Sequence, residues 1–159
     1  MRVILVRHGD ADADIPEGLD DEARALTAKA RGSLPAHFAQ MADRIGAVDL
    51  ILMSPLVRTV QTASLLCHAL GYQGTMRSHR ALFPNGPVGS IETLLEDCRG
   101  KTIVLIGHQP SIGAATAHFL GLTSFPKPVA PGTAIGIDRP DDSPHVGSLL
   151  FYAAPGQLI

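Results

Sequence analysis

An arginine and a histidine stand next to one another near the N-terminus, in the stretch LVRHG. Arg7 and His8 come directly after an aliphatic run, and Gly9 follows them. A guanidinium beside an imidazole disfavours protonation of the ring. The guanidinium is also a planar set of donors that suits a phosphate group, and a neutral imidazole is a nucleophile. The pair therefore indicates chemistry on a phosphoryl group.

Two further stretches carry residues of the same kinds. SPLVRTVQTA begins at Ser54 and includes Arg58, and IGHQP contains His108 and Gln109. Like the first stretch, each follows the end of an aliphatic run. Together the three stretches supply four predicted catalytic residues and three predicted substrate-binding residues: His8, Arg7, Arg58 and His108 in the first group, and Gly9, Ser54 and Gln109 in the second.

The aliphatic runs before these residues read as strands that are buried on both faces. Helical periodicity and turn residues separate them. Strands are expected at 2–6, 48–53, 74–78, 102–107, 133–138 and 147–153. Helices are expected from residue 27 to about 44, from 54 to about 70, over 89–98, and from 111 to about 120.

Several residues mark where the helices should begin. Thr27 is predicted to cap the first helix, although Gly32 and Pro35 predict a kink or a late start. Residues 54–55 are predicted to be the N-cap and first residue of the second helix. Ser90 is predicted to cap the third. The acidic segment 10–25 and the Pro/Gly-rich stretch 80–89 read as loops.

Alternating strands and helices predict a three-layer α/β/α sandwich around a central, mostly parallel sheet. Residues 1–159 are expected to form a single domain, which is an ordinary domain size. Ligands of such sheets bind beyond the carboxyl ends of the parallel strands. The predicted site residues should therefore share one pocket, with the N-termini of two helices adding positive potential.

These motifs resemble those of the histidine phosphatase superfamily, the phosphoglycerate mutase-like branch. The resemblance rests on RHG after the first strand, on SPLVRTVQTA (54–63), on VLIGHQPSI (104–112) and on ALT (25–27). The short chain and RHGDAD are similar to the SixA-type phosphohistidine phosphatases. The resemblance implies that His8 is the nucleophile that becomes phosphorylated, that Arg7, Arg58 and His108 hold the phosphoryl oxygens, and that no cofactor is needed.

The chain departs from that family in its general acid. Larger relatives carry a carboxylate in a loop that corresponds to 80–90, and this stretch has none. Other relatives have an aspartate where Gln109 stands. The proton donor is therefore unassigned at this point, and the candidates are a water molecule and four acids of the N-terminal segment: Asp10, Asp12, Asp14 and Asp20.

Charge and cysteine content exclude other classes of protein. The net charge of −2 gives no basic footprint for nucleic acid, and no apolar run approaches a membrane span. Cys67 and Cys98 lie in apolar stretches, as expected in the reducing cytoplasm. Seven acids crowd residues 10–22, and they form either a solvated loop or a rim that selects a partner.

The expected function is that of a metal-independent phosphatase that removes phosphate from phosphohistidine on a protein. The short chain leaves little material for a lid, and an open pocket suits a macromolecule. A phosphatase of small phosphate esters is the alternative, and a non-catalytic phosphate-binding domain is a weaker one. Arginines beside His8 and His108 argue against a metal there. The remaining histidines are expected to be ordinary surface or boundary residues: His37, His68, His79, His118 and His145.

Overall fold

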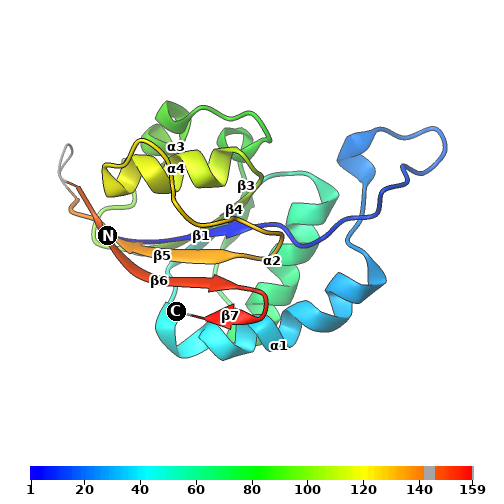
Figure 1. The fold of residues 1–159 in the computed structure, drawn as a ribbon, viewed down its shortest axis with the longest axis horizontal. Coiled ribbons are helices and arrows are strands. Elements are labelled where there is room, and N and C mark those ends of the chain that lie inside the picture. The colour runs from blue at the N-terminus through cyan, green and yellow to red at the C-terminus, as the bar shows by residue number, and fades with distance from the viewer. Residues whose placement is uncertain (142–145, 159) are drawn as a thin grey trace.

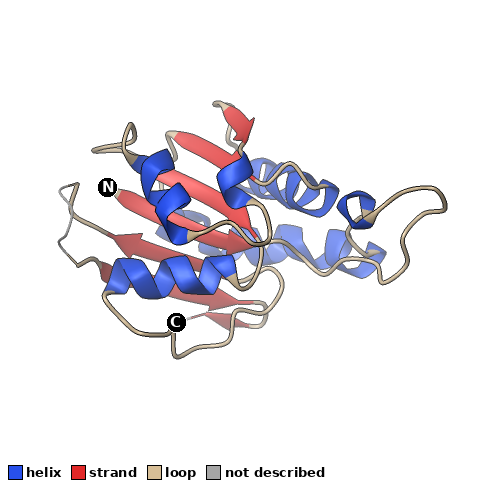
Figure 2. Ribbon diagram, turned by 90° about the horizontal axis from the view of Figure 1, so that it is seen from above, coloured by secondary structure: helices blue, strands red, loops and turns tan. Residues whose placement is uncertain are grey.

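A seven-stranded sheet lies between two layers of helices in the computed structural model, which describes residues 1–141 and 146–158. Figures 1 and 2 show the layers from two sides. The strand order is β3-β2-β4-β1-β5-β6-β7. The strands are β1 (Arg2–Arg7), β2 (Leu50–Met53), β3 (Met76–Ser78), β4 (Thr102–Gly107), β5 (Ala134–Asp138), β6 (Ser148–Ala154) and β7 (Gln157–Leu158).

Strands β1 to β4 pair in parallel, as predicted, and the remaining three continue the sheet in antiparallel pairing. The predicted fold class is confirmed. The last strand, β7, was not expected. It pairs with β6 over only two residues, too short a run for a periodic signal.

The described residues form four α-helices and two short 3₁₀ turns. They are α1 (Ala28–Ile45), α2 (Val57–Leu70), α3 (Val88–Leu95), α4 (Ser111–Leu120), η1 (Asp21–Ala23) and η2 (Arg80–Leu82). Helices α1 and α2 cover one face, where Phe38 and Leu66 pack with Ile4 of the central strand. Helices α3 and α4 cover the other, where Ile91 and Phe119 join Leu5 in a second core.

The structure corrects the starts of three helices. Thr27 caps α1 as predicted, because its side chain accepts from the Ala30 N–H at 3.0 Å, but the helix begins before Gly32 rather than late. Ser54 does not cap α2, which begins at Val57 after Leu56. Ser90 lies inside α3, whose N-cap position is Pro87. Pro55 disfavours a helical conformation at Ser54, so α2 starts later than predicted, whereas α3 starts earlier than predicted, directly after Pro87.

Other expectations concern the cysteines and the membrane. Cys67 and Cys98 are free and buried. No helix among the described residues is long and apolar enough to cross a membrane. Residues 142–145, between β5 and β6, lie outside the described residues.

Candidate active site

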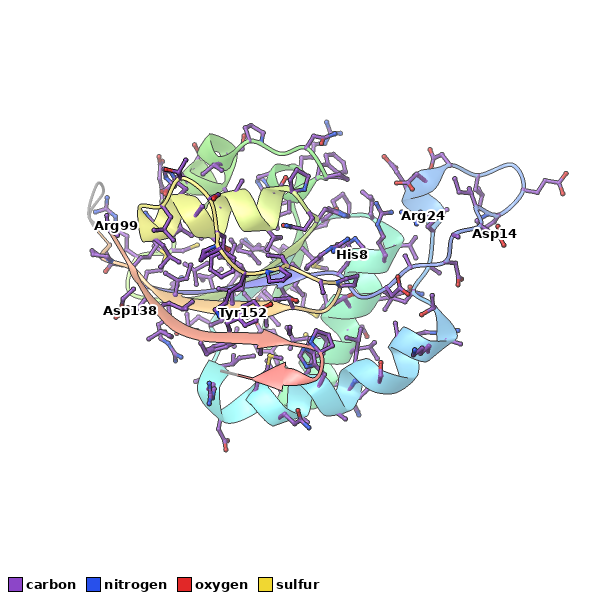
Figure 3. The ribbon with its side chains drawn as sticks, in the orientation of Figure 1. His8, Asp14, Arg24, Arg99, Asp138 and Tyr152 are labelled. Carbon is purple, nitrogen blue, oxygen red and sulfur yellow. The ribbon has the colours of Figure 1, made fainter. Side chains whose placement is uncertain are left out.

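The carboxyl ends of β1, β4 and β2 meet at one edge of the sheet. Arg7 is opposite Gly107, and Met53 is opposite Ile106, so the residues that follow each strand emerge side by side. The rings of His8 and His108 have their centroids 5.1 Å apart. Figure 3 shows His8 at this edge, beyond the arrow of β1. The predicted convergence of the three motifs is therefore present.

His8 is held as a neutral imidazole. Its Nδ1 lies 2.6 Å from the carbonyl oxygen of Gly9. Because a carbonyl only accepts, the proton must be on Nδ1, which leaves the lone pair on Nε2. Burial lowers the pKa of His8 to about 4, and the positive charges of Arg58 and Arg7 act in the same direction. The sequence predicts that the arginines keep the ring neutral, but burial lowers the pKa of His8 more than their charges do.

Arg58 reaches the site from the first turn of α2. Its guanidinium is almost wholly buried, and it donates from Nη1 to the backbone oxygen of Asp21 at 3.0 Å and from Nη2 to the carboxylate of Asp21 at 3.1 Å. Arg7 donates from Nη1 to the carbonyl of Val129 at 2.8 Å. Some N–H groups of each guanidinium thus hold the side chain in place by hydrogen bonds to the protein. The Nε of each is buried without a partner.

His108 pairs with Ser54 rather than with solvent. Its Nε2 lies 2.9 Å from the Ser54 hydroxyl, and its Nδ1 is buried without a partner. Burial is the main cause that lowers the pKa of His108 to about 3, and His8 and Arg58 lower it further. Ser54 therefore orients the ring, and His108 can donate to a phosphoryl oxygen only through one neutral tautomer.

Gly9 and Gln109 have other partners. The N–H of Gly9 donates to the Thr62 hydroxyl at 3.0 Å, and a Cβ at this position would lie 2.5 Å from a methyl of Leu34. A side chain at this position would therefore have to displace the buried Leu34 side chain. The side-chain oxygen of Gln109 accepts from the Gly113 N–H at 2.7 Å and so caps the start of α4. Both positions stabilise the elements on which the site is built.

The arrangement is suited to an anion with several oxygens. Among the described residues, five buried side-chain atoms lack a hydrogen-bond partner, and three of them are Nε of Arg7, Nε of Arg58 and Nδ1 of His108. Buried polar atoms are normally paired, so such a cluster marks a place where a ligand completes the set. A phosphoryl group supplies three acceptor oxygens, and the lone pair of His8 supplies a nucleophile.

Comparison with known proteins gives a result on the fold. No family model matches the chain, and no curated protein matches it. Solved structures do. The protein histidine phosphatase SixA, in complex with tungstate, has a TM-score of 0.87 at 21% identity, and the alignment covers 98% of each chain. SixA from Agrobacterium tumefaciens has a TM-score of 0.82 at 23% identity, covering 97% of each.

The fold is that of the SixA phosphatases. A more distant similarity is to the mycobacterial glucosyl-3-phosphoglycerate phosphatase, with a TM-score of 0.65 at 15% identity over 93% of this chain and 96% of that one. The resemblance drawn from the motifs is thus confirmed for the fold along nearly the whole chain. The SixA match also includes the region where this chain lacks a carboxylate in 80–90.

Two side chains at the site were not predicted. Asp21 holds Arg58 and also accepts from Nε of Arg24 at 2.7 Å, and Thr62 holds the backbone of Gly9. Asp21 was one of seven acids without periodicity, so no signal distinguished it. The threonine lies one helical turn after Arg58, on the same face of α2, and this spacing could have indicated it.

The four predicted proton donors are all exposed. Asp14 is far out on the N-terminal segment, away from His8 (Figure 3). Asp20 accepts from the Glu22 N–H and caps η1. Asp10 and Asp12 accept through their backbone oxygens from Thr27 and Arg24, and Asp10 carries charge near Arg7. None of these contacts places a carboxyl against His8.

The histidines outside the site have varied surroundings. His37 is half-buried, and its Nε2 lies 2.8 Å from the carbonyl of Gly132. His118 pairs with Glu92 on the surface, and His68 is exposed. Within residues 1–141 and 146–158, no group of three His, Cys, Asp or Glu is placed to hold a metal ion. His79 caps η2 through its ring, and His145 lies outside the described residues.

Proposed function

We propose that this chain is a metal-independent phosphatase that acts through a phosphohistidine on His8, and that its substrate is phosphohistidine on a protein. One observation carries the proposal. His8 has its proton fixed on Nδ1 and its lone pair on Nε2, at an edge where Arg7, Arg58 and His108 each have a buried nitrogen without a partner. This is a nucleophile beside donors for a phosphoryl group.

The reaction proceeds in two displacements. Nε2 of His8 attacks phosphorus in line with the bond to the leaving group, which breaks, and the leaving imidazole takes a proton from solvent. Water then attacks the phosphorus, the bond to His8 breaks, and inorganic phosphate leaves while His8 regains its lone pair. Arg7 and Arg58 stabilise the charge on the equatorial oxygens in both steps.

A protein substrate is supported by the shape of the site edge and by the relatives. An open groove adjoins the site, and the structures with the higher TM-scores are described as histidine phosphatases. Phosphatase action on a small phosphate ester is the second candidate, supported by the likeness to the glucosyl-3-phosphoglycerate phosphatase. We further propose one domain and a cytoplasmic location, which agrees with two free cysteines.

Replacement of His8 tests the proposal. His8→Ala is expected to lower turnover of a chromogenic aryl phosphate by several orders of magnitude, as loss of a nucleophile generally does. The wild type should also form an acid-labile phosphoenzyme, seen by phosphorus NMR, that the variant does not form. His68→Ala, on the exposed side of α2, is the matched control. Residual turnover above about a tenth of wild type would contradict the role of His8.

A further inference from the structure

A groove of about 600 Å³ runs along the edge of the candidate active site. One wall is formed by the acidic turn with Asp20, Asp21 and Glu22. The opposite wall is formed by Arg80 and the segment 83–87. This size is in the range of pockets that hold a ligand group or a few side chains.

Both walls are fixed to residues of the site. The acidic wall is bound to Arg58 through Asp21. The opposite wall is bound to α4, because the Ser111 hydroxyl donates to the carbonyls of Pro84 and Gly86 at 2.8 and 3.2 Å. Ser111 is three residues after His108. Both walls are therefore anchored beside the site, one at Arg58 and the other at the start of α4.

The acidic wall belongs to a larger acidic arm (residues 10–25), which projects beyond the sheet edge in Figure 1. It carries seven acidic side chains and one basic one, Arg24. Ile15 and Leu19 on the arm are exposed at 46% and 60%. The arm is tied to the body at its base, where Asp12 N–H donates to Ala25 and Thr27 N–H donates to Asp10.

This charge distribution is unusual for a site that binds an anion. Arg7 and Arg58 bring positive charge to the site at the sheet edge. The adjoining groove carries three acidic side chains against one basic one, Arg80, and the arm is acidic. A polyphosphorylated small molecule would bring a second anionic group against the acidic wall, where like charges repel. A substrate that is anionic only at its phosphoryl group and cationic beside it is complementary to both regions.

We propose that this groove receives the protein segment that flanks the phosphohistidine, and that the acidic wall selects segments with lysine or arginine beside the phosphorylated residue. The inference rests on the proposed phosphatase function and names its substrate class. Phe83 and the prolines of the opposite wall provide apolar contact for the same segment, and exposed Ile15 and Leu19 extend that contact along the arm.

The test compares short phosphohistidine peptides that are identical except for flanking residues, with two lysines, two glutamines or two glutamates. The wild type is expected to show a kcat/KM about tenfold or more higher for the lysine peptide than for the glutamate peptide at low salt. The preference should shrink as ionic strength rises, because exposed charges are screened.

Glu22 provides the decisive variant, since it is exposed and outside the machinery that holds the phosphoryl group. Glu22→Lys should reduce the lysine preference about three- to tenfold, with Glu22→Gln between the two. Both should retain the wild-type kcat/KM for the aryl phosphate, which does not reach the wall. Asp43→Lys, an equal charge change near the end of α1 at the opposite edge, is the matched control and should leave the preference unchanged.

Equal kcat/KM for the three peptides, or a preference that Glu22→Lys and Asp43→Lys alter equally, would overturn this inference. An alkyl phosphate, such as a sugar phosphate, that is hydrolysed better than the lysine peptide would overturn it too. Failure of the phosphatase proposal itself is distinguishable, because the wild type would then hydrolyse neither the aryl phosphate nor any of the peptides.

Discussion

Asp21 holds Arg58 by two hydrogen bonds, from Nη2 to the carboxylate at 3.1 Å and from Nη1 to the backbone oxygen at 3.0 Å. The other carboxylate oxygen accepts from Arg24 at 2.7 Å. The hydrogen bond from Arg24 and the charge of Arg58 hold the pKa of Asp21 below its usual range. The carboxyl is therefore ionised at neutral pH, which suits a positioning residue better than a proton donor.

Loss of this contact should slow turnover. Asp21→Ala is expected to lower kcat for an aryl phosphate about tenfold, because the Arg58 fork loses its orientation toward the phosphoryl oxygens. Asp21→Asn should lose less, since its amide oxygen still accepts one hydrogen bond. The measurement is steady-state kinetics of both variants, with Glu17→Ala on the same acidic arm as control. A wild-type kcat in Asp21→Ala would rule out the positioning role.

The sequence alone could not have shown this contact. The two residues are 37 positions apart, and the acidic arm has neither periodicity nor apolar spacing that would place it against α2. The strand ends were predictable, because continuous aliphatic runs define buried parallel strands and the polar residues after them must share an edge. Local patterns thus determined where the site lies, and a long-range ion pair determined how its arginine is held.

Ser54 illustrates the same limit. Its position before a proline and an apolar periodic segment favours an N-cap. In the structure its hydroxyl instead lies 2.9 Å from His108, which is 54 residues away, and α2 begins at Val57. The N-cap propensity of serine reflects only the hydrogen bonds that its hydroxyl can make to nearby backbone. The partner that Ser54 has in the structure depends on which strands are neighbours in the sheet.

The low pKa values at the site should appear as a loss of stability in acid. An unfolded histidine titrates near 6.5, whereas burial lowers the pKa of His8 to about 4. Between these values the unfolded state binds more protons, so stability is complete above about 6.5 and is lost as the pH falls toward 4. His8 alone should contribute about 2 kcal/mol of this loss by pH 5.

Urea unfolding followed from pH 7.5 to pH 5 measures this loss. His8→Gln should flatten the dependence, because the glutamine does not titrate, while His68→Gln on the exposed side of α2 serves as control. A pH dependence that is the same in His8→Gln and in the wild type would show that His8 is not held neutral by burial.

Chelation should leave the activity unchanged. The two arginines, the neutral histidines and the N-terminus of α4 supply the positive potential and the donors for the phosphoryl oxygens, so the proposed mechanism contains no step for a metal. Turnover of the aryl phosphate is expected to be equal with and without EDTA, and vanadate or tungstate should inhibit competitively. Restoration of a chelated sample by added Mg²⁺ or Zn²⁺ would contradict this mechanism.

The missing carboxylate in 80–90 should determine which leaving groups are accepted. An alkoxide has a very high pKa, so its departure needs a positioned acid, which contributes about 10²–10⁴-fold. The phosphorylated imidazole of a histidine is protonated by solvent and leaves as a neutral ring. An enzyme without a strong general acid should therefore hydrolyse phosphohistidine and activated aryl phosphates far faster than alkyl phosphates, for a chemical reason that is independent of docking.

The measurement is kcat/KM for a phosphohistidine peptide, an aryl phosphate and a sugar phosphate, at one pH and one ionic strength. We expect the sugar phosphate to be the poorest substrate by at least about a hundredfold. Comparable values for the sugar phosphate would mean that a competent donor is present. Single replacements by asparagine at Asp10, Asp12, Asp14 and Asp20 would then identify the donor. Only replacement of the residue that protonates the alkoxide should lower the rate for the sugar phosphate and leave the rate for phosphohistidine unchanged.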